Sequence, residues 1–197
     1  VQEIIQTRRK AHPNQASGDL LDMMLRATDD GAAMTDQQLR DELITILIAG
    51  HETVASALTW ACYLLASNPA VEARLHAELD QVLGGRAPTM DDLPGLDFTR
   101  RVFDETLRLY PPAWLVTRKN LEPDVIGGAR IPAGSLVVVS LATTHRNPAY
   151  WPDPDRFDPD RFLPEIANAR PRYAYLPFGG GPRLCIGNHF ALLEAPL

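Results

Sequence analysis

Cysteine is scarce in this sequence, which has only Cys62 and Cys185 among 197 residues. Two cysteines are too few for the disulfide framework of a small secreted domain. No C-x-x-C pair is present, which argues against a structural zinc site. The N-terminal segment "VQEIIQTRRKAH" also lacks the apolar stretch of a signal peptide. The role of each cysteine must therefore be inferred from its own surroundings.

An excess of positive charge is missing as well, because the formal net charge is -6. Proteins that bind nucleic acids normally carry a basic stripe, so the composition argues against this class. With 45% hydrophobic and 22% charged residues, the chain resembles an ordinary soluble domain. A length of 197 residues is enough for one domain with its own core. We expect helices in the first half and, after Pro111, proline-rich irregular structure with two short strands.

One long apolar segment, "LITILIAGHETVASALTWACYLLA", has about the length of a membrane span. His51 and Glu52 lie at its middle, where a charged side chain costs several kcal/mol in lipid. We therefore expect no membrane span, but a helix buried in the core of a soluble protein. Thr35 and Gln38 form a capping-box pattern, so this helix should begin near residue 36 and end near residue 66.

Polar residues in the middle of that helix indicate a possible ligand surface. Ala49 and Gly50 remove side-chain bulk, and Glu52 and Thr53 offer a carboxyl and a hydroxyl for proton transfer. A large flat molecule could lie against such a face. The alternative is a hydrogen-bonded polar pair within the core, without any ligand.

Further elements follow from caps and breakers. Ser17 or Asp19 could cap a helix that starts near residue 20. Asn68 should cap a helix that Gly84 ends, and another helix should occupy residues 98–109. The segment "DVIGGARIPAGSLVVVSLA" predicts a strand, a Gly-Gly turn and a second strand. The last helix is expected to begin near Cys185.

A charged pair lies in "FDETLRLYPP", where Glu105 and Arg108 are three residues apart and share one helix face. Most such pairs are exposed, but the apolar neighbours of this one favour burial. A buried carboxylate needs further donors, and Arg161 in "FDPDRF" is a candidate because its planar guanidinium suits bidentate pairing.

Cys185 lies in "FGGGPRLCIGNHF", between a glycine-rich loop and the expected helix start. Unpaired backbone N–H groups there favour the thiolate over the thiol. Gly179 and the two glycines after it allow close approach of the loop to another molecule, and Arg183 adds positive charge. The pattern fits a reactive nucleophile, a redox sensor or a metal-bound thiolate. A haem explains most of it, because haem needs one axial thiolate, small residues and arginines for its propionates.

These residues carry a family resemblance: the chain resembles the C-terminal half of a cytochrome P-450, a haem-thiolate monooxygenase. "FGGGPRLCIG" matches the family's cysteine loop at every fixed position. "AGHET" matches its oxygen-activation segment, "ETLR" its glutamate–x–x–arginine helix, and "PDRF" its meander motif. The four motifs occur in the family's order. The resemblance implies a mainly α fold with a small β-sheet, and it implies that residues 1–197 are a partial haem-binding domain of bacterial type.

The resemblance also implies roles for single residues. Cys185 would bind the iron of haem b (iron protoporphyrin IX), with Phe178 packed beside its sulfur and Gly179 in the loop. Propionate contacts would come from Arg183 and Arg118, with His145 assisting. Thr53 and Glu52 would relay protons, and Ala49 and Gly50 would line the oxygen groove. The remaining assignments are the structural triad, Glu105, Arg108 and Arg161, and the substrate-facing residues 113–116.

The activity implied is the oxidation of a small, hydrophobic, organic substrate by dioxygen in the cytoplasm. Electrons would come from NAD(P)H through a ferredoxin, a flavodoxin or a flavoprotein reductase. Two alternatives stay open: a haem-binding or sensing module without turnover, including an inactive fragment, and a thiolate peroxygenase. The Glu52–Thr53 pair favours the monooxygenase, because neither alternative needs a proton relay to dioxygen.

Overall fold

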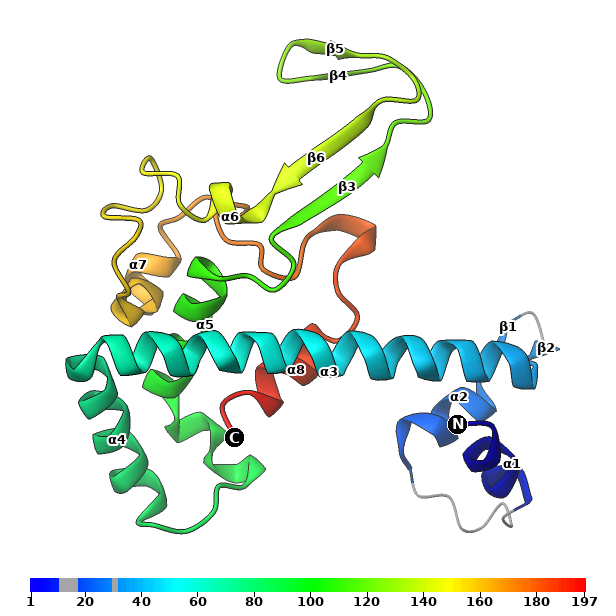
Figure 1. Cartoon of the computed structure of the whole chain (residues 1–197), viewed down its shortest axis with the longest axis horizontal. Coiled ribbons are helices and arrows are strands. Elements are labelled where there is room, and N and C mark those ends of the chain that lie inside the picture. Colours follow the sequence, from blue (N-terminus) through cyan, green and yellow to red (C-terminus); the bar gives the residue numbers. More distant parts are fainter. Residues whose placement is uncertain (11–17, 30–31) are drawn as a thin grey trace. The chain divides into compact units, whose positions relative to one another are not determined.

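A computed structural model describes residues 1–10, 18–29 and 32–197, which are mainly helical with three short antiparallel strand pairs (Figure 1). This confirms the expected fold class. The chain forms two compact units, residues 1–52 and residues 53–197, and the long helix α3 contributes to both. The first unit contains, before α3, the elements α1 (Gln2–Lys10), α2 (Leu20–Arg26), β1 (Thr28–Asp29) and β2 (Ala32–Ala33).

The second unit contains the elements around the expected site. In chain order they are α4 (Pro69–Leu83), η2 (Met90–Gly95), α5 (Asp97–Leu109), β3 (Leu115–Lys119), β4 (Asp124–Ile126), β5 (Ala129–Ile131), β6 (Leu136–Ser140), α6 (Leu141–Thr144), η3 (Pro159–Phe162), α7 (Pro164–Ala167), η4 (Gly181–Arg183) and α8 (Asn188–Glu194). The elements labelled η are short 3-10 helices. The expected helix at residues 98–109 is confirmed as α5, which begins one residue earlier.

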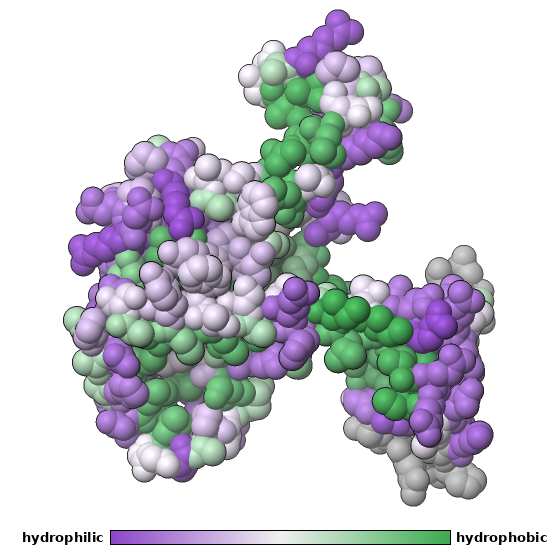
Figure 2. All heavy atoms as spheres, viewed as in Figure 1, coloured by the Kyte–Doolittle hydropathy of each residue, from purple (hydrophilic) through white to green (hydrophobic). Residues whose placement is uncertain are grey.

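Helix α3 spans Asp36–Ser67, as the capping pattern predicts. The Gln38 N–H donates to Thr35 Oγ1 (3.2 Å) and the Thr35 N–H to Gln38 Oε1 (2.9 Å), so both halves of the capping box form. The expected burial of this helix is wrong for this chain, because only 6% of its most apolar window is buried. Leu47 and Ile48 are exposed, and apolar surface follows α3 in Figure 2. By length and composition, α3 is the one described helix that could cross a membrane.

Two predicted helix caps have different outcomes. Asp19 caps α2 through a hydrogen bond from the Asp22 N–H, while the alternative cap, Ser17, lies outside the described residues. Asn68 precedes α4 as expected, but its side chain accepts no hydrogen bond there. Its amide instead donates to the Leu64 carbonyl at 2.8 Å, which satisfies an acceptor at the end of α3. Gly84 ends α4 in the left-handed conformation, as predicted.

The strand pairing differs from the expected hairpin. The Gly-Gly turn connects β4 to the short β5, and the β-branched strand β6 pairs with β3 instead. The register sets Leu115 opposite Ser140 and Lys119 opposite Leu136. The reason is that residues 132–135 interrupt the strand between β5 and β6, so β6 is free to pair with β3. Figure 1 shows the β3–β6 ribbon with the β4–β5 hairpin at its far end.

The core of the second unit is built around α5. Its buried apolar side chains come from α3, α5 and the loop before η3: Leu64, Phe98, Val102, Leu109 and Phe157. Inside this helix lies a fully buried ion pair between Glu105 and Arg108. Arg108 Nε is 2.6 Å from Glu105 Oε2, and Arg108 Nη2 is 2.8 Å from Oε1. The pair predicted from the i, i+3 spacing is therefore formed, and it is bidentate.

Arg108 uses all five of its N–H groups. Besides the two bonds to Glu105, it donates to three backbone carbonyls, those of His145 (2.9 Å), Pro154 (2.6 Å) and Arg156 (3.1 Å). Glu105 Oε1 also accepts the Asp158 N–H at 2.9 Å, and Arg161 Nε lies 3.5 Å from it. One guanidinium thus fixes the proline-rich loop against α5.

Replacing Glu105 by glutamine should destabilise the protein by about 3–5 kcal/mol, because it leaves the Arg108 charge buried without its counter-ion. Urea unfolding of the purified variant measures the change. Asp97→Asn is the matched control on the same helix, since Asp97 is 66% exposed in its pair with Arg101 and should cost less than about 0.5 kcal/mol. Equal stabilities of the two variants would contradict a structural role for the buried pair.

Candidate functional site

The cysteine loop, residues 178–187, presents the Cys185 thiol to solvent. Its backbone closes on itself, because the Cys185 N–H donates to the Phe178 carbonyl at 3.0 Å. Gly179 and Gly181 have φ angles of 75° and 70°, which side chains rarely tolerate. A Cβ at Gly180 would lie 3.0 Å from the Tyr173 ring. The glycines are thus required by the backbone path itself.

The last helix begins later than predicted. Helix α8 starts at Asn188, so Cys185 lies three residues before it and is not in its first turn. The reason is that Gly187 occupies the N-cap position and the Cys185 N–H is used inside the loop. The thiol is therefore positioned by the closed loop, and the expected stabilisation of its thiolate by unpaired N–H groups of a helix start does not apply to it directly.

The surface around Cys185 is apolar and positively charged. Leu184, Ile186 and Phe190 are exposed, and Ile186 is 94% exposed. Arg183 is exposed and, among the described residues, has no carboxylate within ion-pair distance. Arg118 on β3 is exposed too and donates to the Thr117 carbonyl at 2.8 Å. An apolar molecule with an acidic group matches the chemistry of the exposed side chains beside Cys185 in the sequence.

Phe178 connects the cysteine loop to the core. Its side chain packs against the buried cluster of Ala57, Phe103 and Leu107, which belongs to α3 and α5. Its carbonyl accepts the Cys185 N–H. The position of the loop therefore depends on an apolar anchor as well as on its glycines.

His145 lies in the interior, where it binds the segment that precedes the cysteine loop. Its side chain is fully buried, and Nε2 accepts the Leu176 N–H at 3.0 Å, two residues before Phe178. Burial lowers the pKa of His145 to about 4, so the ring is neutral and can accept this bond. The structure thus places His145 with Arg108 and Leu176, apart from the exposed arginines with which the sequence grouped it.

The small and polar residues in the middle of α3 form a second exposed set. Ala49, Gly50, Glu52 and Thr53 follow one another along the helix, and all are exposed. A Cβ at Gly50 would meet no atom within 4 Å in this chain, so packing here does not require glycine. Ala49, Gly50 and Glu52 belong to the unit of residues 1–52, and Thr53 belongs to the unit of residues 53–197.

One half-buried carboxyl near the site carries no sequence signal of its own. Asp104 accepts a hydrogen bond from the Tyr175 hydroxyl at 3.0 Å, and burial raises the pKa of Asp104 to about 6. Tyr175 directly precedes Leu176, so this bond holds the same stretch that His145 holds. Asp104 follows Phe103 in the apolar face of α5, and this position is the only hint that the sequence offers.

His145 and Asp104 should have opposite effects on the free energy of unfolding as the pH falls. His145 has a lowered pKa, so its stabilisation is lost as the pH falls from about 6.5 towards 4, by about 3 kcal/mol. Asp104 has a raised pKa, so it gains stability as the pH falls from about 6 to 4, by about 3 kcal/mol. Asp104→Asn should therefore lose more stability than the wild type on acidification, and His145→Gln less.

Urea unfolding of the three proteins between pH 4 and pH 7 measures these slopes. Parallel profiles for wild type and Asp104→Asn would show that the Asp104 carboxyl titrates in its ordinary range, contrary to the expected rise of its pKa.

Comparison with known proteins gives a consistent result. A sequence profile described as Cytochrome P450 matches residues 1–197. Cyclooctatin synthase from Streptomyces melanosporofaciens is 54% identical over 190 residues, which cover 95% of this chain and 41% of that protein. Pentalenene oxygenase from Streptomyces avermitilis is 43% identical over 198 residues, covering 100% of this chain and 44% of that protein.

Solved structures agree with these sequence relatives. The crystal structure of the cytochrome P450DA heme domain has a TM-score of 0.92 and 41% identity, and the match covers 100% of this chain and 44% of that one. This chain spans about two fifths of the length of the curated relatives named here. Because the profile covers every residue and the cysteine loop, buried pair and meander lie within it, the chain belongs to the cytochrome P450 family.

Proposed function

We propose that the protein containing this chain is a haem-thiolate monooxygenase that uses dioxygen to oxidise a small hydrophobic substrate. The observation that carries the proposal is the closed cysteine loop, which holds an exposed thiol within an exposed apolar surface. In this proposal residues 1–197 are part of a single haem domain. The exposed apolar face of α3 then packs against the rest of that domain.

The residues of the second unit fit haem b. Cys185 would hold the iron through its sulfur, and the loop would accept the flat ring because Gly179 has no side chain. Arg183 and Arg118 would bind the propionates, since both are exposed and neither has a carboxylate partner among the described residues. A bound haem supplies the oxidising chemistry, which thiolate ligation tunes towards O–O cleavage. We further propose that His145 assists indirectly, by positioning the chain before the cysteine loop through its bond to the Leu176 N–H.

The residues of α3 would supply protons and space. Thr53 and Glu52 would hold and pass a proton from solvent, because a hydroxyl both donates and accepts, and a carboxylate can take up a proton and then donate it as the carboxylic acid. Ala49 and Gly50 would leave room beside them for a small molecule. All four residues are exposed in this chain, which gives them access to water and to a ligand.

Substrate and electron donor are inferred at the level of class. Relatives are named pentalenene oxygenase and cyclooctat-9-en-7-ol 5-monooxygenase, which favours a hydrophobic cyclic substrate here as well. We infer that residues 113–116 face this substrate, since Trp114, directly before strand β3, is exposed. Electrons would come from NAD(P)H through a ferredoxin, a flavodoxin or a flavoprotein reductase, in the cytoplasm.

Replacing Cys185 by histidine in the full-length protein tests the ligand. The ferrous CO complex should lose the red-shifted Soret band, because this band depends on thiolate donation to the iron. Cys62→Ser is the matched control, since Cys62 is also a free, exposed cysteine and should leave the band in place. A Cys185→His protein that retains the red-shifted band would refute the assignment.

Replacing Thr53 by alanine tests turnover against mere haem binding. The variant should bind haem and consume NAD(P)H at a near-normal rate, but should form less product and more hydrogen peroxide per NAD(P)H. The reason is that proton delivery loses its hydroxyl while haem ligation does not use Thr53. Thr59→Ala is the control on the same helix, because the Thr59 hydroxyl bonds only to the Ala55 carbonyl. Unchanged coupling would remove Thr53 from the mechanism, and a wild type without turnover would favour a haem-binding module.

A further inference from the structure

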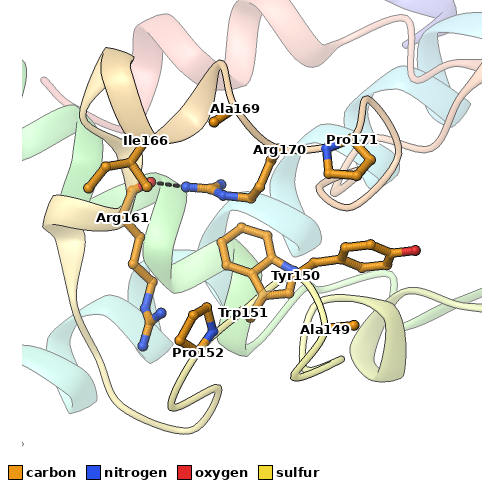
Figure 3. Close-up of a pocket in the computed structure, with 9 residues that line it drawn as sticks. All are labelled: Ala149, Tyr150, Trp151, Pro152, Arg161, Ile166, Ala169, Arg170 and Pro171. Carbon is orange, nitrogen blue, oxygen red and sulfur yellow. Dashed lines mark hydrogen bonds between the residues drawn. The ribbon is translucent and has the colours of Figure 1, made fainter.

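A groove of about 250 Å³ lies in the proline-rich part of the second unit, formed by the loop at residues 149–152, η3, α7 and the chain after it (Figure 3). The proposed haem chemistry uses none of its open surface. Two arginines, Arg161 and Arg170, line it together with aromatic and aliphatic side chains. In Figure 3 the Arg170 side chain lies beside Trp151 and reaches the backbone of Arg161, whereas the Arg161 side chain points away from it, towards Pro152.

The positive charges at this groove exceed the negative ones. Arg161 is 10% exposed, donates from Nη2 to the Asp153 carbonyl at 2.7 Å, and makes no hydrogen bond from Nε. Arg170 donates to the Arg161 carbonyl and has no carboxylate within ion-pair distance among the described residues. Glu105 is the nearest acid, at 3.5 Å from Arg161 Nε, and its two oxygens already bind Arg108 and the Asp158 N–H.

This excess positive charge has an energetic consequence. An arginine stays charged at neutral pH, and a charge withdrawn from water is costly unless an opposite charge accompanies it. Burial lowers the pKa of Arg170, which reflects this cost. An anion that enters the groove would supply the missing partner.

The groove also has an apolar, rigid wall. The Arg170 guanidinium lies 4.1 Å from the centre of the Trp151 ring, and Trp151 is fixed because its Nε1 donates to the Ala174 carbonyl at 3.2 Å. Tyr150 and Ile166 are 40% and 46% exposed at the rim of the groove. A doubly charged, fully hydrated anion such as phosphate would leave this wall unused, whereas a hydrocarbon group would cover it.

We propose that this groove binds a small organic monocarboxylate, with the carboxylate on Arg170 and the hydrocarbon part against the apolar wall. The planar guanidinium of Arg170 matches the geometry of a carboxylate. The site is separate in sequence from the cysteine loop, and it does not depend on which substrate the protein oxidises.

Isothermal titration of benzoate into the haem-loaded full-length protein tests the proposal. A ligand of this size with one paired charge should bind with a Kd on the order of 1 mM. Arg170→Gln should weaken binding about tenfold or more, because it removes a charge-assisted bond. Arg172→Gln should leave the Kd unchanged, since Arg172 is exposed over the Tyr173 ring and does not line the groove.

Further measurements separate the possible sources of a signal. Benzyl alcohol, which lacks the charge, and sodium chloride, which lacks the ring, should both bind at least about tenfold more weakly than benzoate. The Soret band should not change as benzoate binds, because the groove is not the haem site. Arg170→Lys keeps the charge and should bind with intermediate affinity, so it replaces the glutamine variant if the latter does not fold.

The proposal is overturned by any of four results. The first is that benzoate does not bind at concentrations well above the expected Kd. The others are equal affinity of the Arg170 and Arg172 variants for benzoate, equal affinity of the protein for benzyl alcohol and benzoate, and a Soret shift that follows the binding curve. The last result would place benzoate at the haem and leave the assignment of Cys185 untouched.

Discussion

The geometry of the second unit depends on one guanidinium. Arg108 is fully buried in α5 and directs its five N–H groups to one carboxylate and three backbone carbonyls. The carbonyls belong to residues 145, 154 and 156, which have no helix or strand of their own to hold them. The loop that leads to η3 and, further on, to the cysteine loop therefore takes its position from a side chain and not from a backbone ladder.

A second pair of contacts continues this arrangement towards the thiol. His145, whose carbonyl binds Arg108, accepts the Leu176 N–H, and the neighbouring Tyr175 binds Asp104. Phe178 then packs on α5 through Phe103 and Leu107. The entry to the cysteine loop is thus attached to α5 directly by the Asp104 carboxyl and by Phe178, and indirectly by the His145 ring, whose residue is held by Arg108.

Local patterns in the sequence predicted much of this and missed what depends on the chain's path. The Glu105–Arg108 pair and the capping box of α3 follow from residues three positions apart, and both are present. The β3–β6 pairing and the burial of His145 depend on where the chain turns back, and the segment "THRNP" is itself polar, so it gives no sign of an interior position. The sequence predicts too early a start for α8, because nothing in it marks Gly187 as the residue that precedes the helix.

The hydrogen bond between the Cys185 N–H and the Phe178 carbonyl closes a ring of eight residues. The path of this loop is therefore set by contacts within the polypeptide. A ligand that arrives afterwards does not have to order the backbone, so less of its intrinsic affinity is lost to conformational entropy. In the order of biosynthesis, the polypeptide can shape the receiving surface first and be loaded second.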